Sequence, residues 1–302
     1  MVGPAVHHLV VQAFETGSFP LVINETLMVL ILKVDAPTSI NQFHPISLCN
    51  VIYKIITKVL VQLKQFMPRL IHPLHASFVP GRQATDNIIV AQEILHSLQR
   101  SKSLSRGMFV KIDLEKAYDK VNWQFLFQAL HLLHFSPSIV NLIATCVTST
   151  NIYVLWNGHQ SAKFKPTLGL HQGDPLSPFL FVLYLERLSS MIDKAVTDHK
   201  WRPCMVCRGG PFILHLLFAD NLLLFSRATM NQATIVMDVL SLFSSQAGQS
   251  VSASKSVIFF SPRVLHAVQL QICRIASMRA TTDLGKYLGI SLLFMRPSKH
   301  TY

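Results

Sequence analysis

The chain has 302 residues, of which half are hydrophobic and 14% are charged. Its length allows one large domain or two modest ones, and its apolar content excludes an intrinsically disordered chain. The 27 Lys and Arg residues outnumber the 15 Asp and Glu residues, which gives a formal net charge of +12. Such a charge attracts polyanions, nucleic acid above all, although basic residues can also serve solubility alone.

Cysteine usage and hydropathy predict the compartment. The five cysteines are too few for a disulfide scaffold, and their odd number fits free thiols in a reducing environment. The most apolar stretch, 212–225, is interrupted by His215, Asp220 and Asn221 and is therefore no membrane span. No basic segment precedes an apolar core near the start, so we expect no secretory signal and a soluble, intracellular protein.

Helical patterns dominate the first third of the chain. Apolar residues recur at helical spacing over 51–70, with lysines largely off the apolar stripe. Residues 78–82 are a predicted turn, and a second helix is expected over about 85–98, with Asp86 in its first turn where it suits the helix dipole. Half of the net charge falls within 51–110. Solvated helix faces explain these basic residues as well as phosphate contacts do.

The middle of the chain mixes strands and helices. Residues 108–113 are a short apolar run that predicts a buried strand. Asn122 is a possible N-cap for an amphipathic helix over 123–133. Residues 151–154 predict another strand, which ends before a turn at 157–158.

The last half of the chain contains a loop, a helix and a hairpin. Residues 169–178 form a loop rich in glycine and proline, and an apolar helix follows over about 179–192. Two apolar arms around a polar tip predict a tight hairpin over 214–225. Later short strands are expected at 257–260 and 287–293. This mixture of helices and hairpins predicts an α+β fold.

Two aspartates stand at the ends of predicted apolar strands. Asp113 ends the strand at 108–113, and Asp220 lies at the tip of the hairpin. A carboxylate among buried neighbours is costly unless it is paired or binds a metal. If the two strands lie side by side, both carboxylates reach one edge of a sheet and form an oxygen-rich site suited to Mg²⁺. Spacing alone leaves this reading and two simple turn caps equally open.

Several segments, taken together, resemble the reverse transcriptase domain of LINE-type (non-LTR) retroelements, closest to the plant kind. Each is short, but they run in the family's order and span most of the chain. They are FHPISLCN at 43–50 with Tyr53-Lys54, ASFVPGR at 76–82 with Thr85-Asp86-Asn87, DLEKAYD at 113–119, the loop at 169–178, FAD at 218–220 and KYLG at 286–289.

The resemblance implies a right-hand polymerase fold with fingers and an antiparallel palm sheet. It makes 1–302 one reverse transcriptase domain, with an N-terminal and fingers-like part at 1–107, a palm at 108–290 and a short tail at 291–302. The thumb is expected to be missing, and so is a preceding endonuclease segment. The implied reaction is DNA synthesis on an RNA template from a DNA primer and deoxynucleoside triphosphates, with two Mg²⁺ ions.

The family's functional residues carry over onto matching positions. The resemblance implies that Asp113 and Asp220 are the metal ligands, with Asn221 assisting weakly. Lys255 falls where related polymerases keep a lysine near the pyrophosphate, which it could protonate as a general acid. An exposed surface lysine is the simpler reading of Lys255.

Four further residues match positions near the nucleotide or template. Tyr118 corresponds to an aromatic residue that excludes ribonucleotides, although it could also be a core tyrosine packed on the palm helix. Gln172 and Gly173 match the loop beside the incoming nucleotide and template, where glycine allows backbone to approach a ligand. Arg82 is a plausible contact for template or triphosphate.

Three departures from the family pattern weaken the expectation of activity. Asn221 replaces the second aspartate of the family's FADD tip, which removes one negative charge from the metal site. His44 and His171 stand where the family usually has arginine, which is permanently charged, whereas histidine is mostly neutral at pH 7. The chain therefore resembles a decayed copy. A catalytically inactive nucleic-acid-binding remnant of the same fold, or an unstable pseudogene product, remain alternatives.

Other metal-binding signals are weak. Cys204 and Cys207 form a lone CxxC without a second pair at suitable spacing, so free thiols are the simpler reading. His7 and His8 are better explained as part of a helix surface. No phosphate-binding glycine loop followed by lysine is present, so the sequence does not support an ATPase.

Overall fold

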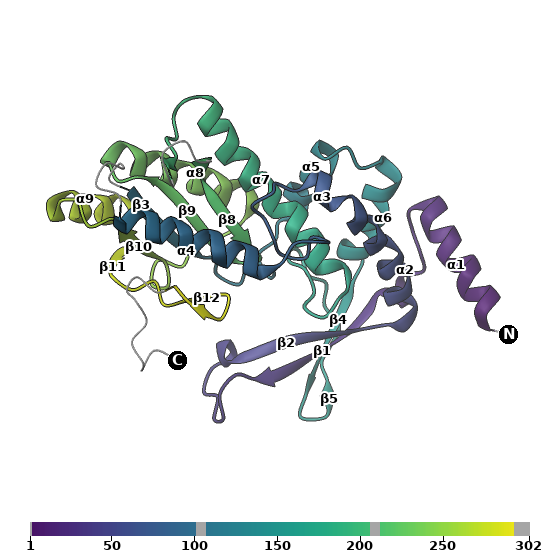
Figure 1. Cartoon of the computed structure of the whole chain (residues 1–302). Coiled ribbons are helices and arrows are strands. Elements are labelled where there is room, and N and C mark those ends of the chain that lie inside the picture. The colour runs from purple at the N-terminus through teal and green to yellow at the C-terminus, as the bar shows by residue number, and fades with distance from the viewer. Residues whose placement is uncertain (1, 101–106, 206–211, 293–302) are drawn as a thin grey trace. The chain divides into compact units, whose positions relative to one another are not determined.

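The computed structural model describes residues 2–100, 107–205 and 212–292. The chain separates into two compact units. Unit 1 consists of Met1–Leu70 and Tyr118–Tyr184, and unit 2 consists of Ile71–Ala117 and Leu185–Tyr302. Each unit combines a β-sheet with helices (Figure 1), so the predicted α+β class is confirmed.

Unit 1 is built on a four-stranded sheet with the order β2-β1-β4-β5. Strand β1 (Glu25–Leu32) pairs antiparallel with β2 (Phe43–Cys49) and parallel with β4 (Asn151–Trp156). A turn at Asn157 and Gly158, both with positive φ, joins β4 to β5 (His159–Gln160). The predicted turn is confirmed, and the strand predicted at 151–154 is two residues longer.

The helix predicted over 51–70 is helical throughout but changes its winding. It consists of α2 (Val51–Val61), the 3₁₀-helix η3 (Gln62–Phe66) and α3 (Met67–Leu70). Pro68 has no N–H to donate to residue 64, so a regular α-helix cannot continue through this point. The periodicity predicted the helical stretch but not this change of winding.

The remaining helices of unit 1 pack against one another. Helix α5 (Trp123–Leu132) begins as predicted, because the Asn122 side chain accepts a hydrogen bond from the Phe125 N–H. The sequence reading missed α6 (Pro137–Thr148), although proline at its first position is a start signal. The remaining helical segments are α1 (Val2–Thr16), which carries exposed His7 and His8, and the 3₁₀-helices η1 (Leu21–Asn24) and η2 (Ile40–Gln42).

Unit 2 is built on a five-stranded sheet with the order β11-β10-β3-β9-β8. The central strand β3 (Gly107–Asp113) is flanked antiparallel by β9 (Asn221–Arg227) and β10 (Val257–Phe260). The outer strands are β8 (His215–Phe218) and β11 (Arg279–Thr281). The buried strand predicted at 108–113, the hairpin at 214–225 and the strand at 257–260 are therefore confirmed.

Helices cover the sheet of unit 2. Helix α4 (Ala84–Arg100) crosses the sheet in Figure 1 and contacts β8, and α8 (Met230–Ala247) packs on α9 (His266–Ala276). Helix α7 (Leu176–Thr197) starts earlier than predicted and contributes its second half to unit 2. The core beneath α4 includes Phe109 and Phe225, whose rings meet edge to face at 4.6 Å.

The single strand predicted at 287–293 is wrong. The chain forms a hairpin of β12 (Lys286–Tyr287) and β13 (Ile290–Ser291), because Leu288 and Gly289 both take a positive φ and reverse its direction. Leu293 lies outside the described residues. A second short pair consists of β6 (Cys204–Met205) and β7 (Phe212–Ile213). Cys207 also lies outside the described residues, so the CxxC prediction is not addressed.

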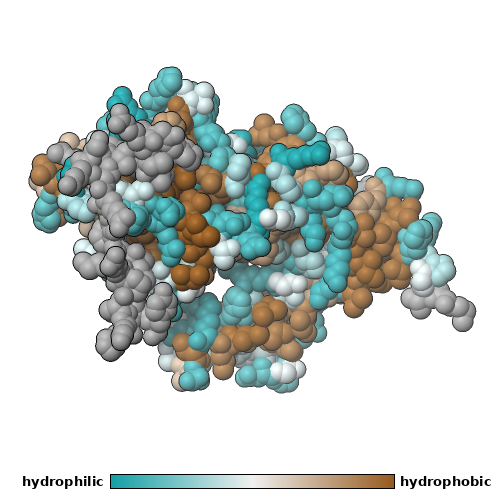
Figure 2. Space-filling model, in the orientation of Figure 1, coloured by the Kyte–Doolittle hydropathy of each residue, from teal (hydrophilic) through white to brown (hydrophobic). Residues whose placement is uncertain are grey.

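Exposed apolar side chains occur on helices as well as on strands. Within 2–100, 107–205 and 212–292, no helix is long and apolar enough to cross a bilayer. Some of the exposed apolar side chains gather on and beside the β1–β2 hairpin of unit 1, part of which is brown in Figure 2. They include Ile31, Leu32, Val34 and Ile40.

Candidate active site

The edge of the unit 2 sheet brings the two predicted metal ligands onto neighbouring strands. Asp113 is the last residue of β3, and it lies opposite Asn221, the first residue of β9. Asp220 directly precedes Asn221 in the two-residue turn that joins β8 to β9. The side-by-side arrangement of the two strands, on which the sequence-based prediction of a shared site depends, is therefore present.

The two carboxylates interact electrostatically. Partial removal from water and the negative charge of Asp113 raise the pKa of Asp220 above its ordinary value. Lys255 and the side chain of Asn221 oppose this rise, and the Asn221 amide donates to Asp220 Oδ1 over 3.1 Å. Two nearby carboxylates repel each other, and a bound cation would relieve that repulsion.

A loop between α8 and β10 adds a positive charge to this edge. Lys255 Nζ lies 3.7 Å from Asp113 Oδ1, and its side chain is largely exposed. Two hydrogen bonds attach the loop to the end of β3, because the Asp113 N–H donates to Ser256 Oγ and the Ser252 N–H donates to the Asp113 carbonyl. The sequence reading missed Ser252 and Ser256, which no motif marks.

The chemistry of these side chains fits a hard divalent cation. Asp113, Asp220 and the amide oxygen of Asn221 offer only oxygen donors, the type that Mg²⁺ prefers. No cluster of three or more His, Cys, Asp or Glu side chains suited to a metal occurs in the described part of the chain. At the sheet edge, Asn221 contributes a neutral amide beside the two carboxylates.

In unit 1, the predicted nucleotide loop is attached to strand β2. The Ser47 N–H donates to the Gln172 carbonyl over 2.7 Å, and Gln172 Nε2 donates to Asp119 over 3.4 Å. Gly173 has a φ of +101°, and a Cβ there would lie 2.9 Å from the Ser47 carbonyl oxygen. The close approach that requires glycine is thus made to Ser47, within the protein.

Asp174 fastens the same loop from inside. Its buried carboxylate accepts from the Tyr53 hydroxyl at 2.7 Å and from the Leu176 N–H at 3.0 Å. Burial raises the pKa of Asp174, and these hydrogen bonds, with one from Thr57, oppose the rise. The sequence reading missed this role, although Asp174 followed by Pro175 is a helix-start signal.

Tyr118 and His171 complete the unit 1 side of the prediction. The Tyr118 ring is half-buried and stacks on Phe181 of α7, with ring centroids 4.5 Å apart. Burial lowers the pKa of His171 to about 4, so this side chain is uncharged at neutral pH. His171, Gln172 and Asp119 line part of a pocket of about 220 Å³.

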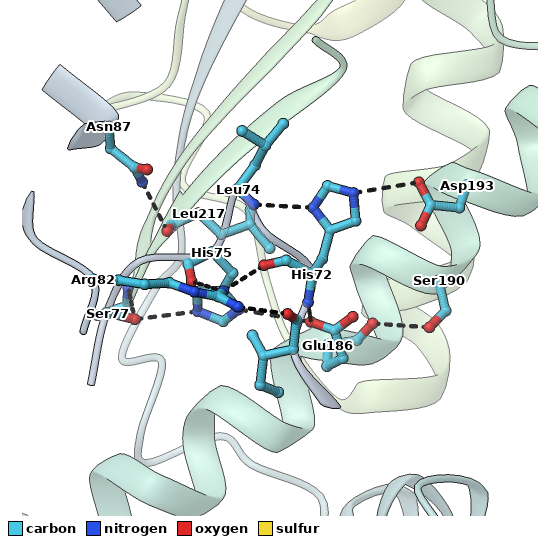
Figure 3. Close-up of polar contacts among 12 residues, drawn as sticks. His72, Leu74, His75, Ser77, Arg82, Asn87, Glu186, Ser190, Asp193 and Leu217 are labelled. Atoms are coloured by element: carbon cyan, nitrogen blue, oxygen red, sulfur yellow. Dashed lines mark hydrogen bonds and ion pairs between the residues drawn. The ribbon is translucent and has the colours of Figure 1, made fainter. Parts of the chain in front are cut away.

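Arg82 belongs to a buried polar network in unit 2 (Figure 3). Its guanidinium donates to the carbonyl oxygens of Ile71, His72 and His75 at 2.6–2.9 Å. These bonds fasten the turn around residue 82, which the sequence predicted over 78–82. A contact of Arg82 with nucleic acid stays a prediction.

Comparisons with known proteins show the family of the chain. The family model described as reverse transcriptase (RNA-dependent DNA polymerase) matches residues 31–292. The "Transposon TX1 uncharacterized 149 kDa protein" of Xenopus laevis is 32% identical over 65% of this chain and 15% of that relative. The Pol polyprotein of the type-2 retrotransposable element R2DM of Drosophila melanogaster is 25% identical over 91% of this chain and 26% of that relative.

A solved structure has a similar fold. Apo telomerase from Candida tropicalis, truncated from its C-terminal domain, superimposes with a TM-score of 0.56 at 15% identity, over 80% of this chain and 51% of that chain. The chain spans less than a third of the two transposon relatives. The family model covers most of the chain, including the acidic edge (the sheet edge with Asp113 and Asp220) and the loop at 169–178. The chain therefore belongs to the reverse transcriptase (RNA-dependent DNA polymerase) family, as a domain of the non-LTR retrotransposon type.

Proposed function

We propose that this chain adds deoxynucleotides to the 3′-hydroxyl of a primer on an RNA template, as part of a larger retrotransposon protein. The supporting observation is the register that sets Asp113 opposite Asn221, with Asp220 beside it in the turn. On this reading 108–290 form the palm and 1–107 the fingers-like part. The plant kind of element remains a proposal that rests on the sequence motifs.

Each residue of the acidic edge has a defined task. Asp113 and Asp220 would hold two Mg²⁺ ions through carboxylate oxygens. When bound, the ions activate the primer hydroxyl and stabilise the leaving pyrophosphate in an in-line displacement. Lys255 would deliver a proton from Nζ to the leaving pyrophosphate as a general acid. Its ion pair with Asp113 keeps it beside the reacting groups while leaving it accessible.

Unit 1 would supply the contacts to nucleotide and template. We propose that Tyr118, held flat against Phe181, excludes a ribose 2′-hydroxyl. Gln172 and Gly173 would meet the base or template from a loop that Ser47, Tyr53 and Asp174 hold in place. A pre-organised loop lowers the entropic cost of positioning the incoming nucleotide.

A second candidate function is nucleic-acid binding without catalysis. Asn221 favours it, because two carboxylates and the Lys255 ammonium leave these four side chains with a single net negative charge. Such a site binds divalent cations more weakly than one with a third carboxylate. The net charge of +12 would still support binding to a polyanion.

Primer extension on an RNA template with Mg²⁺ separates the two functions. The variants are Asp113→Ala, Asn221→Asp and the control Asp238→Ala, which removes an exposed aspartate from α8. If the chain is a polymerase, Asp113→Ala abolishes nucleotide incorporation, Asp238→Ala leaves it unchanged and Asn221→Asp increases it. No incorporation by the natural chain, with recovery in Asn221→Asp, identifies the binding remnant. Incorporation that persists in Asp113→Ala would contradict the two-metal assignment.

A further inference from the structure

A segment before α4 runs along β8, the outer strand of the β8–β9 hairpin whose turn carries Asp220. The Leu217 N–H donates to the Leu74 carbonyl at 3.0 Å, and the Ala76 N–H donates to the Leu217 carbonyl at 3.1 Å. His75 and Leu217 are paired in parallel orientation. The segment at 74–76 therefore extends the sheet next to β8, and it lies close to the turn that carries Asp220.

Ser77 reaches that turn directly. Its side chain is buried, and its Oγ accepts a hydrogen bond from the Ala219 N–H at 2.9 Å. Ala219 has a φ of +49°, a conformation that few residues other than glycine adopt. A backbone held in this region needs support from its surroundings. The bond from Ala219 to Ser77 is such a support, one residue before Asp220.

The His75 ring lies between Ser77 and Glu186 (Figure 3). His75 Nε2 lies 3.1 Å from Ser77 Oγ, and His75 Nδ1 lies 4.0 Å from Glu186 Oε2. Burial lowers the pKa of His75, which keeps the ring neutral. His75 Nδ1 has no hydrogen-bond partner within the described residues, and Glu186 is the carboxylate it faces. In the tautomer with the proton on Nδ1, Nε2 accepts from the Ser77 hydroxyl. The Oγ lone pairs then point to the Ala219 N–H.

The network is anchored at both ends. Glu186 Oε2 accepts from the His72 N–H at 3.1 Å, and Arg82 donates to the carbonyls of His72 and His75. These groups are buried or half-buried, so no solvent or substrate reaches Ser77. The arrangement of Glu186, His75 and Ser77 resembles a hydrolytic triad in its order alone. Its bonds lead to a backbone N–H, so its action is to position.

We propose that Ser77, oriented by His75 and Glu186, is a positioning residue for the turn at 219–220. By holding this turn it would direct the Asp220 carboxylate toward the two Mg²⁺ ions of the proposed function. This inference deepens the proposed function and depends on it for the role of Asp220. It also explains a motif that the proposed chemistry leaves unused, because ASFVPGR at 76–82 supplies both Ser77 and the Arg82 anchor.

Ser77→Ala tests the inference in the full chain, with Ser189→Ala as its matched control. Ser189 is also buried, and its Oγ has no hydrogen-bond partner among the described residues. The readouts are amide hydrogen exchange of a peptide covering 218–222, with 257–260 as internal reference, and Mn²⁺ affinity. We expect Ser77→Ala to speed exchange at 218–222 about tenfold and to weaken Mn²⁺ binding about tenfold. The reference peptide and Ser189→Ala should stay unchanged.

An exchange rate or an Mn²⁺ affinity equal to that of Ser189→Ala would contradict the role of Ser77. If Ser77→Ala does not fold, His75→Gln and His75→Leu replace it. Glutamine can still form a hydrogen bond with the Ser77 hydroxyl, so His75→Gln should keep the natural exchange rate at 218–222 and the natural Mn²⁺ affinity. His75→Leu should show faster exchange and weaker Mn²⁺ binding. Equal behaviour of the two variants would contradict the positioning role of Ser77. A natural chain that binds no Mn²⁺ would count against the proposed function alone, and the exchange rates would then decide.

Discussion

Two aspartates from family motifs, Asp174 in unit 1 and Asp220 in unit 2, have opposite surroundings. Asp174 is buried, and hydrogen bonds from the Tyr53 hydroxyl and the Leu176 N–H occupy both of its oxygens. Asp220 is exposed at a turn, where it accepts from the Asn221 amide and has a like charge nearby. A carboxylate with its acceptor sites filled stabilises the fold, whereas an open one can bind a cation.

Two lysines differ in the same way. Lys111 is half-buried on β3, and its Nζ donates to the carbonyls of Leu284 and Lys286. It therefore attaches the start of the β12–β13 hairpin to the central strand. Burial lowers the pKa of Lys111. Lys255 is exposed, and its Nζ lies 3.7 Å from Asp113 Oδ1. Asp174 and Lys111 have hydrogen-bond partners within the protein, and we expect their substitution to change stability. We expect substitution of Asp220 and Lys255 to change activity.

Asp220→Asn should have the largest effect. Loss of a metal-binding charge is expected to lower primer extension about 10³-fold, because metal ions contribute several kcal/mol of transition-state stabilisation. The thermal midpoint should not fall, since the substitution removes a repulsion with Asp113. Extension assays and thermal unfolding measure the two effects. Undiminished extension, or unfolding at a much lower temperature, would contradict the expectation that Asp220 serves activity and Asp174 serves stability.

Lys255→Met and Lys111→Met should separate activity from stability. Without its general acid, Lys255→Met is expected to lose about 10²-fold in the rate of nucleotide addition at unchanged stability. Lys111→Met removes two hydrogen bonds and should lower the free energy of unfolding by about 2 kcal/mol. Single-turnover kinetics and urea unfolding distinguish them. If both variants lose rate alone, the distinction between the lysines is wrong.

Tyr53→Phe should destabilise unit 1 through Asp174. Removing the hydroxyl leaves a buried charge with one donor fewer and is expected to cost about 2 kcal/mol at pH 7. Because the folded pKa of Asp174 is raised, its charge lowers stability as the pH rises from 3.8 through that pKa. The cost should therefore shrink at a pH below 3.8, where Asp174 is protonated in the folded chain.

Urea unfolding at both pH values measures this cost. Tyr153→Phe is the matched control, because its hydroxyl makes only a long 3.4 Å bond to Glu25. Equal losses for the two tyrosines would show that the Asp174 contact has no special weight.

His215→Leu should produce the smallest change. His215 is buried, neither ring nitrogen has a hydrogen-bond partner in the described residues, and burial lowers its pKa to about 3. The unfolded chain takes up this proton first, so stability falls as the pH drops from 6.5 toward 3. Leucine should add about 1 kcal/mol at pH 7 and reduce that pH dependence. An unchanged profile of unfolding free energy against pH would contradict this account of His215.

Local patterns predicted the elements that local physics determines. The hairpin around Asp220, the cap at Asn122 and the buried strand ending at Asp113 all follow from short-range hydropathy and turn chemistry. The strands β1 and β2 escaped prediction, because exposed apolar residues such as Leu32 and Leu48 obscure their alternation.

Long-range hydrogen bonds were not predictable. Nothing in the pattern around Ser77 indicates that it meets Ala219, 142 positions along the chain. Likewise, no local pattern indicates that Gly173 makes its tight contact with Ser47. Such roles depend on which distant segment supplies the partner, and a single sequence does not contain that information.

Titration with Mn²⁺, followed by electron paramagnetic resonance, tests the central claim most directly. Asp113→Asn and Asp220→Asn should each weaken binding by at least about tenfold, while Asp174→Asn, which keeps an acceptor for Leu176, should bind like the natural chain. Binding that survives both substitutions at the sheet edge, or that depends on Asp174 instead, would contradict the assignment of the metal pair to Asp113 and Asp220.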